Sequence, residues 1–256
     1  MKLNEIYTVI DKVAPFDLSR EYCEKYGAYD NSGILVDCGD EIEGVLFSLD
    51  CSMAAVERAK SINANLIITH HPAIFSPIKG LRADNPVTEC AKAGISVISA
   101  HLNLDSAEGG IDENMASGLG AKGKIQKMHT LSAGSYGSVF AIERTALAAF
   151  VNQVKAQFHT DRVVVYGDRS VNKVASFCGA GLDEGSIRFA LSSGADTIVS
   201  SDPKHHLIAM AVENGMNVVI LTHYAAENYG FYKFYQKIGE KCSLVPMAYF
   251  EDERLM

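Results

Sequence analysis

The sequence has no excess of positive charge, no long apolar run and no closely spaced pair of cysteines. Its 23 Lys and Arg residues against 31 Asp and Glu residues give a net charge of −8, which repels nucleic-acid backbones and anionic membranes. No apolar stretch approaches the roughly 18 residues that a membrane-spanning helix needs. We therefore expect neither a membrane nor a nucleic acid as a partner.

The six cysteines form no CxxC motif, which predicts free and mostly buried thiols in a reducing cytoplasm; they are Cys23, Cys38, Cys51, Cys90, Cys178 and Cys242. Residues 1–16 carry acidic side chains within their apolar stretch and lack the long apolar core of a signal peptide. The apolar residues from Ile6 to Val13 follow helical spacing, which predicts an amphipathic helix. We expect a cytoplasmic protein.

Short apolar runs alternate with helical patterns along the 256 residues, of which 48% are hydrophobic and 21% charged. Strands are predicted at 44–50, 65–69, 95–99, 162–167, 173–178, 197–201, 217–221 and 244–250. Helices are predicted at 52–62, 86–93, 111–119, 146–157, 183–193 and 225–238. Apolar strands separated by helices indicate an α/β fold with a mainly parallel sheet covered on both faces.

Residues 118–138 are rich in glycine and polar side chains, which predicts a crossover between two domains. The parts on either side echo each other: residues 64–72 (ANLIITHHP) resemble 195–203 (ADTIVSSDP), and residues 90–101 resemble 211–223. Two interpretations stay open. Either an α/β unit is duplicated, or strand–loop junctions of this kind simply look alike.

Four of the eight histidines directly follow predicted strands, namely His70, His71, His101 and His223. A carboxylate lies four residues after two of them, Asp105 in HLNLD and Glu227 in HYAAE. If a helix begins by His223, this step places His223 and Glu227 on one helix face. Open α/β sheets build their functional sites at such strand ends.

Imidazole nitrogens and carboxylate oxygens together suit zinc, manganese, iron or nickel. Two neighbouring histidines in a loop can serve two neighbouring ions, and a carboxylate can bridge them. Three or four histidines with two carboxylates match a two-metal site that keeps positions open for water. The alternative for any single histidine is a hydrogen-bonded loop residue, which we assign to His129, His159, His205 and His206.

These motifs resemble the Nif-three-like dinuclear metal-centre family, whose members are often named GTP cyclohydrolase I type 2 homologs. The resemblance runs from about residue 5 to 250, and its segments are Asp30-Asn31-Ser32-Gly33, the strand ending in Asp50, Thr69-His70-His71-Pro72, Ala100–Asp105 with Gly109-Gly110, and Thr222–Glu227. Tyr29 and Ser32 differ from the Trp and the Val or Ile that the family often has there. This difference concerns the wall of the pocket and no proposed ligand.

The resemblance implies five metal ligands, which are His70, His71, Asp105, His223 and Glu227. It further implies that Glu227 or Asp105 bridges the ions and that His101 lies nearby as a ligand or proton carrier. It implies two similar α/β domains with mixed, mainly parallel sheets, the second (126–218) inserted into the first (1–125 plus about 219–256). It also implies a ring-shaped homohexamer.

Three other segments admit a second interpretation. Residues 173–185 resemble a dinucleotide-binding turn, but Glu184 stands at the third glycine position, and the acidic charge there suits helix capping. The aromatic stretch 229–235 could stack on nucleotides, but core packing or a subunit interface explains it better. Residues 202–206 could hold an ion or touch a phosphate, although Asp202 as helix cap with Pro203 in the first turn is simpler.

The function that we expect is a dinuclear divalent-metal hydrolase that acts on an anionic small molecule, with His101 as general acid/base. Two divalent ions and two carboxylates leave a charge of about +2, which attracts an anion and lowers the pKa of water. The resemblance implies a nucleotide, GTP, as substrate. The alternative is a non-enzymatic metal-binding scaffold or regulator that forms a ring oligomer.

Overall fold

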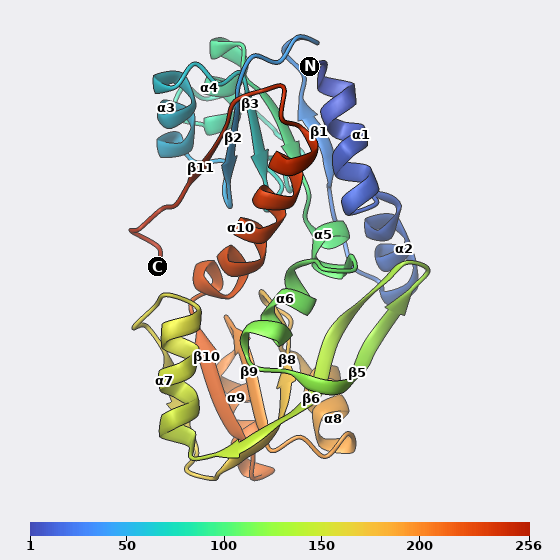
Figure 1. The fold of residues 1–256 in the computed structure, drawn as a ribbon, viewed down its shortest axis with the longest axis vertical. Coiled ribbons are helices and arrows are strands. Elements are labelled where there is room, and N and C mark those ends of the chain that lie inside the picture. Colours follow the sequence, from blue (N-terminus) through green and yellow to red (C-terminus); the bar gives the residue numbers. More distant parts are fainter. The chain divides into compact units, whose positions relative to one another are not determined.

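Two β-sheets with helices packed on them make up the computed structural model, which describes residues 1–256 (Figure 1). The chain forms two compact units. The first comprises Met1–Ala107 and Phe231–Asp252, and the second comprises Glu108–Gly230 with Glu253–Met256. The domain boundaries predicted from the sequence are near residues 125 and 219. In the structure the first boundary comes earlier, after Ala107, because α6 (Ile111–Gly118) packs on the second sheet. The second boundary comes later, after Gly230, because α10 (His223–Lys241) begins in the second unit.

The first unit contains a five-stranded sheet in the order β1-β4-β3-β2-β11. Its strands are β1 (Gly33–Val36), β2 (Val45–Ser48), β3 (Leu66–Thr69), β4 (Ser96–Ser99) and β11 (Met247–Phe250). Its helices are α1 (Leu3–Val13), α2 (Asp17–Tyr26), α3 (Met53–Ser61), α4 (Pro86–Ala93), α5 (Leu102–Ser106) and the C-terminal part of α10. All neighbouring strands are parallel except β1, which runs antiparallel to β4.

Alternate residues of these strands face opposite sides of the first sheet, as the two-residue period of a strand requires. Leu46 and Ile67 belong to the apolar cluster that α3 and α4 cover (Figure 1). Phe47, the next residue along β2, contacts the rings of Phe231 and Phe234 in α10 at centroid distances of 6.1 Å each. Core packing is therefore the confirmed role of these two aromatic residues of the stretch 229–235.

The second unit contains a six-stranded sheet in the order β5-β6-β8-β9-β10-β7. Its strands are β5 (Lys122–Leu131), β6 (Gly134–Thr145), β7 (Val164–Tyr166), β8 (Val171–Ser176), β9 (Thr197–Ser201) and β10 (Asn217–Leu221). Its helices are α6, α7 (Leu147–Gln157), α8 (Glu184–Ser192), α9 (His205–Glu213) and the first turns of α10. The crossover predicted at 118–138 is wrong, because most of that stretch forms the antiparallel hairpin of β5 and β6.

Both units share one topology. In each, three parallel strands joined by helices lie side by side, β2-β3-β4 in the first and β8-β9-β10 in the second, and an antiparallel strand pairs with the last of them. This correspondence supports duplication of an α/β unit as the origin of the sequence echo. The carboxyl ends of three parallel strands meet at one edge of each sheet, and β1, being antiparallel, begins at that edge.

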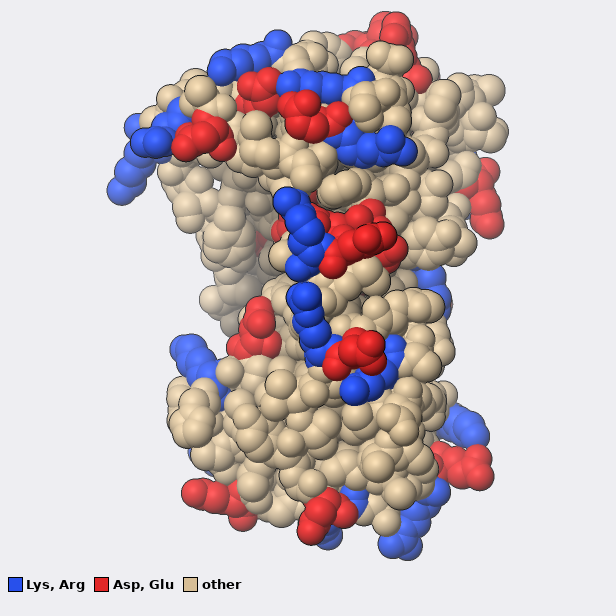
Figure 2. Space-filling view, turned by 90° about the vertical axis from the view of Figure 1, so that its left-hand side faces the viewer, with Lys and Arg blue, Asp and Glu red and all other residues tan.

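The surface carries charges of both signs. On the face shown in Figure 2, Lys and Arg side chains alternate with Asp and Glu and form no continuous basic surface.

None of the helices has the length and apolar character that crossing a membrane requires. All six cysteines are free, as predicted.

Candidate metal centre

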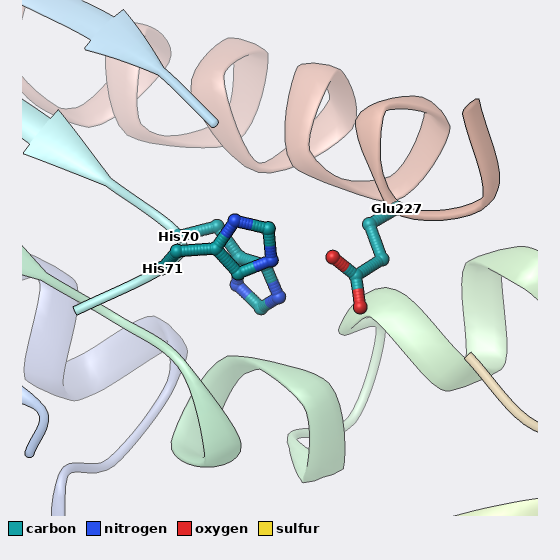
Figure 3. Close-up of side chains that lie close together, drawn as sticks. All are labelled: His70, His71 and Glu227. Atoms are coloured by element: carbon teal, nitrogen blue, oxygen red, sulfur yellow. The ribbon is translucent and has the colours of Figure 1, made fainter. Parts of the chain in front are cut away.

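His70 and His71 stand where β3 ends, at the carboxyl edge of the first sheet (Figure 3). The backbone leaves the strand there because the N–H groups of both residues donate to the Leu49 carbonyl, at 3.2 and 3.0 Å. Their rings consequently do not diverge as they would in a strand: the centroids are 5.0 Å apart and the planes are tilted by 46°. Both imidazole rings therefore lie close enough together to contribute ligands to one site.

The fully buried ring of His70 is oriented from both of its nitrogens. Nδ1 lies 2.9 Å from the Ala100 carbonyl oxygen, and Nε2 lies 3.4 Å from Oδ1 of Asp105. A carbonyl can only accept, so Nδ1 carries the proton and donates it. In the neutral ring Nε2 then carries a lone pair that faces the Asp105 carboxylate. A cation bound between Nε2 and this carboxylate would stabilise the arrangement.

His71 and His101 are each held by a carboxylate behind the ring. Nδ1 of His71 lies 2.7 Å from Oδ1 of Asp50, and Nδ1 of His101 lies 2.8 Å from Oδ1 of Asp30. Asp50 follows β2, and Asp30 precedes β1, so both carboxylates come from the same sheet edge as the histidines. A carboxylate on one ring nitrogen fixes the tautomer and makes the other nitrogen a better ligand or base.

Asp30 is the centre of a small hydrogen-bond network. Burial alone would raise its pKa, but hydrogen bonds from His101, Ser19 and Ser32 outweigh burial and lower the pKa to about 2. Burial likewise lowers the pKa of His101, while the hydrogen bond to Asp30 and the charges of Asp105 and Asp30 raise it overall. The pair therefore favours the ionised aspartate and the imidazolium.

Asp105 reaches the site because a short helix follows His101 directly. The N–H of Asp105 donates to the His101 carbonyl at 2.8 Å, and Asn103, buried in the same turn, donates to the Ala14 carbonyl at 2.7 Å. Ligand atoms of His70, His101 and Asp105 all lie within 4.8 Å of one another. This buried group could hold a metal ion.

The second unit carries His223 and Glu227 at the equivalent edge of its own sheet. His223 follows β10 and opens α10, so the predicted four-residue step is confirmed, with His223 Nε2 3.0 Å from Glu227 Oε2. Nδ1 of His223 lies 2.7 Å from Oδ2 of Asp202, which follows β9. A single ring proton cannot satisfy two carboxylates, so this set also favours either an imidazolium or a bound cation.

Asp202 does not cap a helix, so that prediction is wrong. Lys204 stands at the N-cap of α9, and Asp202 adopts a left-handed backbone with φ 49°. This conformation belongs to the short turn between β9 and α9, from which the carboxylate reaches His223. Asp183, by contrast, caps α8 by accepting from the Ser186 N–H at 2.7 Å, as the acidic charge there predicts.

The loop after β8 surrounds the carboxylate of Glu227. Gly179 has φ 57°, and a Cβ atom at this position would overlap Oε1 of Glu227. The buried sulfur of Cys178 lies within 4.8 Å of the same carboxylate. The turn that resembles a dinucleotide-binding loop thus packs against the buried carboxylate of Glu227.

The predicted ligands therefore fall into two sets, one in each unit. His70, His71, His101 and Asp105 converge at the edge of the first sheet, and His223 and Glu227 meet in α10 of the second, where Figure 3 draws Glu227. The sequence places Asp30 and Asp50 only within the segments that carry the resemblance, and Asp202 in a possible ion site or helix cap. It does not predict that these three carboxylates stand behind the histidine rings. The feature that all three share in the sequence, and that could have indicated them, is an acidic residue next to the end of a strand. The other histidines lie elsewhere, His129 in β5, His159 after α7, and His205 and His206 exposed at the start of α9.

A family model described as Duf34/NIF3 (NGG1p interacting factor 3) matches residues 1–252 of this chain. The chain belongs to the DUF34/NIF3 family. A relative from Clostridium perfringens, named GTP cyclohydrolase 1 type 2 homolog, is 30% identical over 252 residues, covering 94% of this chain and 92% of the relative. A relative of the same name from Methanocaldococcus jannaschii is 28% identical, covering 95% and 97%. The resemblance read from the motifs is confirmed.

Solved structures share the fold of this chain. Reduced HcgD from Methanocaldococcus jannaschii superposes with a TM-score of 0.82 at 26% identity and covers 98% of both chains. A Bacillus cereus protein related to NIF3 has a TM-score of 0.83 at 20% identity, covering 99% of this chain and 97% of its own. The predicted α/β fold class with mixed, mainly parallel sheets is confirmed.

Asp30 makes the stability of the metal-free protein depend on pH. Its folded pKa of about 2 lies below the ordinary 3.8, so its contribution is present above pH 4 and is lost as pH falls towards 2. Asp30→Asn should lower the free energy of unfolding by about 2 kcal/mol at pH 6 and by roughly half as much at pH 3. Denaturant titrations in EDTA at both pH values measure this, with the exposed Asp168→Asn as control. An equal loss at both values would contradict the assignment.

Proposed function

We propose that this member of the DUF34/NIF3 family is a divalent-metal-dependent hydrolase that acts on a nucleotide. The ligands would be His70, His71, Asp105, His223 and Glu227, holding two ions drawn from zinc, manganese, iron or nickel.

The observation that carries this proposal is the oxygen acceptor behind each histidine. The Nδ1 atoms of His70, His71 and His223 all lie 2.7–2.9 Å from a carbonyl or carboxylate oxygen. This leaves Nε2 of each ring as the atom that can bind a metal, which is how metal-binding histidines in proteins are ordinarily oriented.

His101 would act as the general acid/base. Asp30 holds its Nδ1, so Nε2 is the atom that takes up and returns a proton, and the buried carboxylate stabilises the imidazolium in between. Asp30 would be a positioning residue, since it acts through His101. When bound, divalent ions supply the Lewis acidity that lowers the pKa of water and neutralises an anionic substrate.

The substrate class rests on charge and on the relatives. A centre with a charge of about +2 in a chain of net charge −8 would concentrate a small anion at one place. Relatives that match nearly the whole chain are named GTP cyclohydrolase 1 type 2 homologs, which favours a purine nucleotide. Phosphate esters are the second class to screen.

Removal of a ligand should lower metal content. Protein with His71→Ala or Glu227→Ala, purified without added metal, should hold clearly less divalent metal per chain than the wild type, as measured by elemental analysis. His129→Ala, which removes an imidazole from β5, serves as control and should hold as much as the wild type. Unchanged metal content in both ligand variants would refute the ligand assignment.

Gly179→Ala tests the position of the Glu227 carboxylate without replacing any proposed ligand. The added methyl group would displace the buried carboxylate of Glu227 from its position beside His223. Gly194 has a similar φ of 72° with nothing within 4 Å of a Cβ, so Gly194→Ala matches the backbone strain alone. Both variants should lose unfolding free energy through backbone strain, but only Gly179→Ala should bind metal more weakly in competition with a chelator. Equal metal affinities of the two variants would show that the packing of Gly179 against Glu227 is irrelevant to metal binding.

His101→Gln separates three roles on one preparation. If His101 carries protons, metal content stays at the wild-type level and hydrolysis falls by about 10²–10⁴-fold. If it is a ligand, metal content and turnover fall together. If the protein is a scaffold, the wild type hydrolyses neither GTP nor simple phosphate esters above the metal-free background, which would end the hydrolase proposal for those substrates. We expect the first result.

We also propose that the chain assembles into a homohexamer, as its family resemblance implies. Sedimentation equilibrium or light scattering at micromolar concentration should give six times the chain mass of 27.7 kDa. A strict monomer would contradict this part of the proposal and would leave the metal ligands unaffected.

A further inference from the structure

The connection from β3 to α4 is far longer than the fold requires. It spans residues 70–85 and forms neither helix nor strand, whereas the equivalent connection in the second unit, from β9 to α9, needs only residues 202–204. Both connections join corresponding strands and helices of one topology. Irregular loops of this length are uncommon in compact domains, and binding loops and active-site lids are among them; this one begins at His70 and His71.

This loop exposes an aromatic ring beside the candidate proton carrier. Phe75 is 49% exposed, and its ring centroid lies 6.4 Å from that of His101, with the planes at 84°. Tyr29 is 58% exposed, and its ring meets Phe75 edge to face at 5.4 Å and 86°. Tyr29 directly precedes Asp30, the carboxylate behind His101. Both rings therefore lie on residues that border the site.

The backbone beneath the two rings is held in place by polar contacts. Asn31 Nδ2 donates to the Ile74 carbonyl at 2.6 Å, which ties the segment of Tyr29 to that of Phe75. The Ala73 N–H donates to Ser99 Oγ at 3.1 Å, which anchors the loop to the end of β4. The rings are thus presented on an ordered support, and about half of each remains open to solvent.

We propose that Tyr29 and Phe75 form an aromatic platform for the planar heteroaromatic base of the substrate, in which one ring stacks on the base and the other, perpendicular to it, contacts the base edge, and so determine specificity for nucleotides at this site. Exposed aromatic surface next to polar groups is costly in water and favours a ligand that is flat, apolar on its faces and polar at its edges. A nucleobase has this character, and stacking on aromatic side chains is its common mode of binding. The inference rests on the proposed function for the identity of the reaction, but its binding step stands independently.

The test compares two ligands that differ by the base. Guanosine monophosphate and ribose 5-phosphate are titrated calorimetrically into the full-length wild type and into Tyr29→Leu and Phe75→Leu, which keep apolar side chains without the ring. Each variant should weaken binding of guanosine monophosphate by about 5- to 150-fold, the range for one stacked base. Binding of ribose 5-phosphate, which has no base to stack, should be unchanged.

The control is Leu81→Ala, which removes an apolar side chain that is 74% exposed from the same loop. It should bind both ligands as the wild type does. The platform is refuted if the wild type does not bind guanosine monophosphate, if the ring variants bind it unchanged, or if they lose both ligands equally. It is also refuted if sedimentation shows that the ring variants dissociate an oligomer that the wild type forms, since the rings would then be a subunit contact.

Failure of the platform and failure of the proposed function give different results. A protein that hydrolyses GTP with the same KM in wild type and ring variants retains the function and loses the platform. A protein that hydrolyses nothing, yet binds guanosine monophosphate through Tyr29 and Phe75, retains the platform and loses the function.

Discussion

The oxygen atom behind each histidine ring is the contact on which the candidate centre depends. A neutral imidazole has one proton, and an acceptor at Nδ1 decides that the lone pair is on Nε2. Ala100, Asp50, Asp30 and Asp202 supply these acceptors for His70, His71, His101 and His223, respectively. Without them the rings could turn or exchange tautomers, and neither metal binding nor proton transfer would have a defined geometry.

The acceptors and the histidines coincide because of the sheet topology. Parallel strands end at one edge, so residues that directly follow different strands lie near each other however far apart they are in the chain. The two units repeat this arrangement with different residues: His70 and His71 stand after β3, where Asp202 stands after β9, while His101 with Asp105 corresponds to His223 with Glu227. The same topology thus places three histidines at the edge of the first sheet and one histidine with two carboxylates at the edge of the second.

Local patterns were predicted well where the determining interaction is itself local. The His223–Glu227 step depends only on helical spacing, and the Asp183 cap depends on residues three positions apart. The prediction at 118–138 is wrong because β5 is a half-exposed strand with polar residues and glycines, so its hairpin pairing leaves no apolar period. The strand β1 has only four residues, too few to show a period, and in the mostly polar helix α2 only Leu18, Ser19 and Tyr22 are buried, so neither element was predicted.

The sequence by itself determined the α/β class, the family and the set of histidines and carboxylates at strand ends, because apolar period and motif spacing are properties of neighbouring residues. Only the tertiary structure decided which acid serves which ring. Asp30 and His101 are 71 positions apart, and Asp50 and His71 are 21 apart. They meet because β1 runs antiparallel to β4 and β2 runs parallel to β3. Strand pairing of this kind is set by packing of the whole sheet, which no local stretch of sequence specifies.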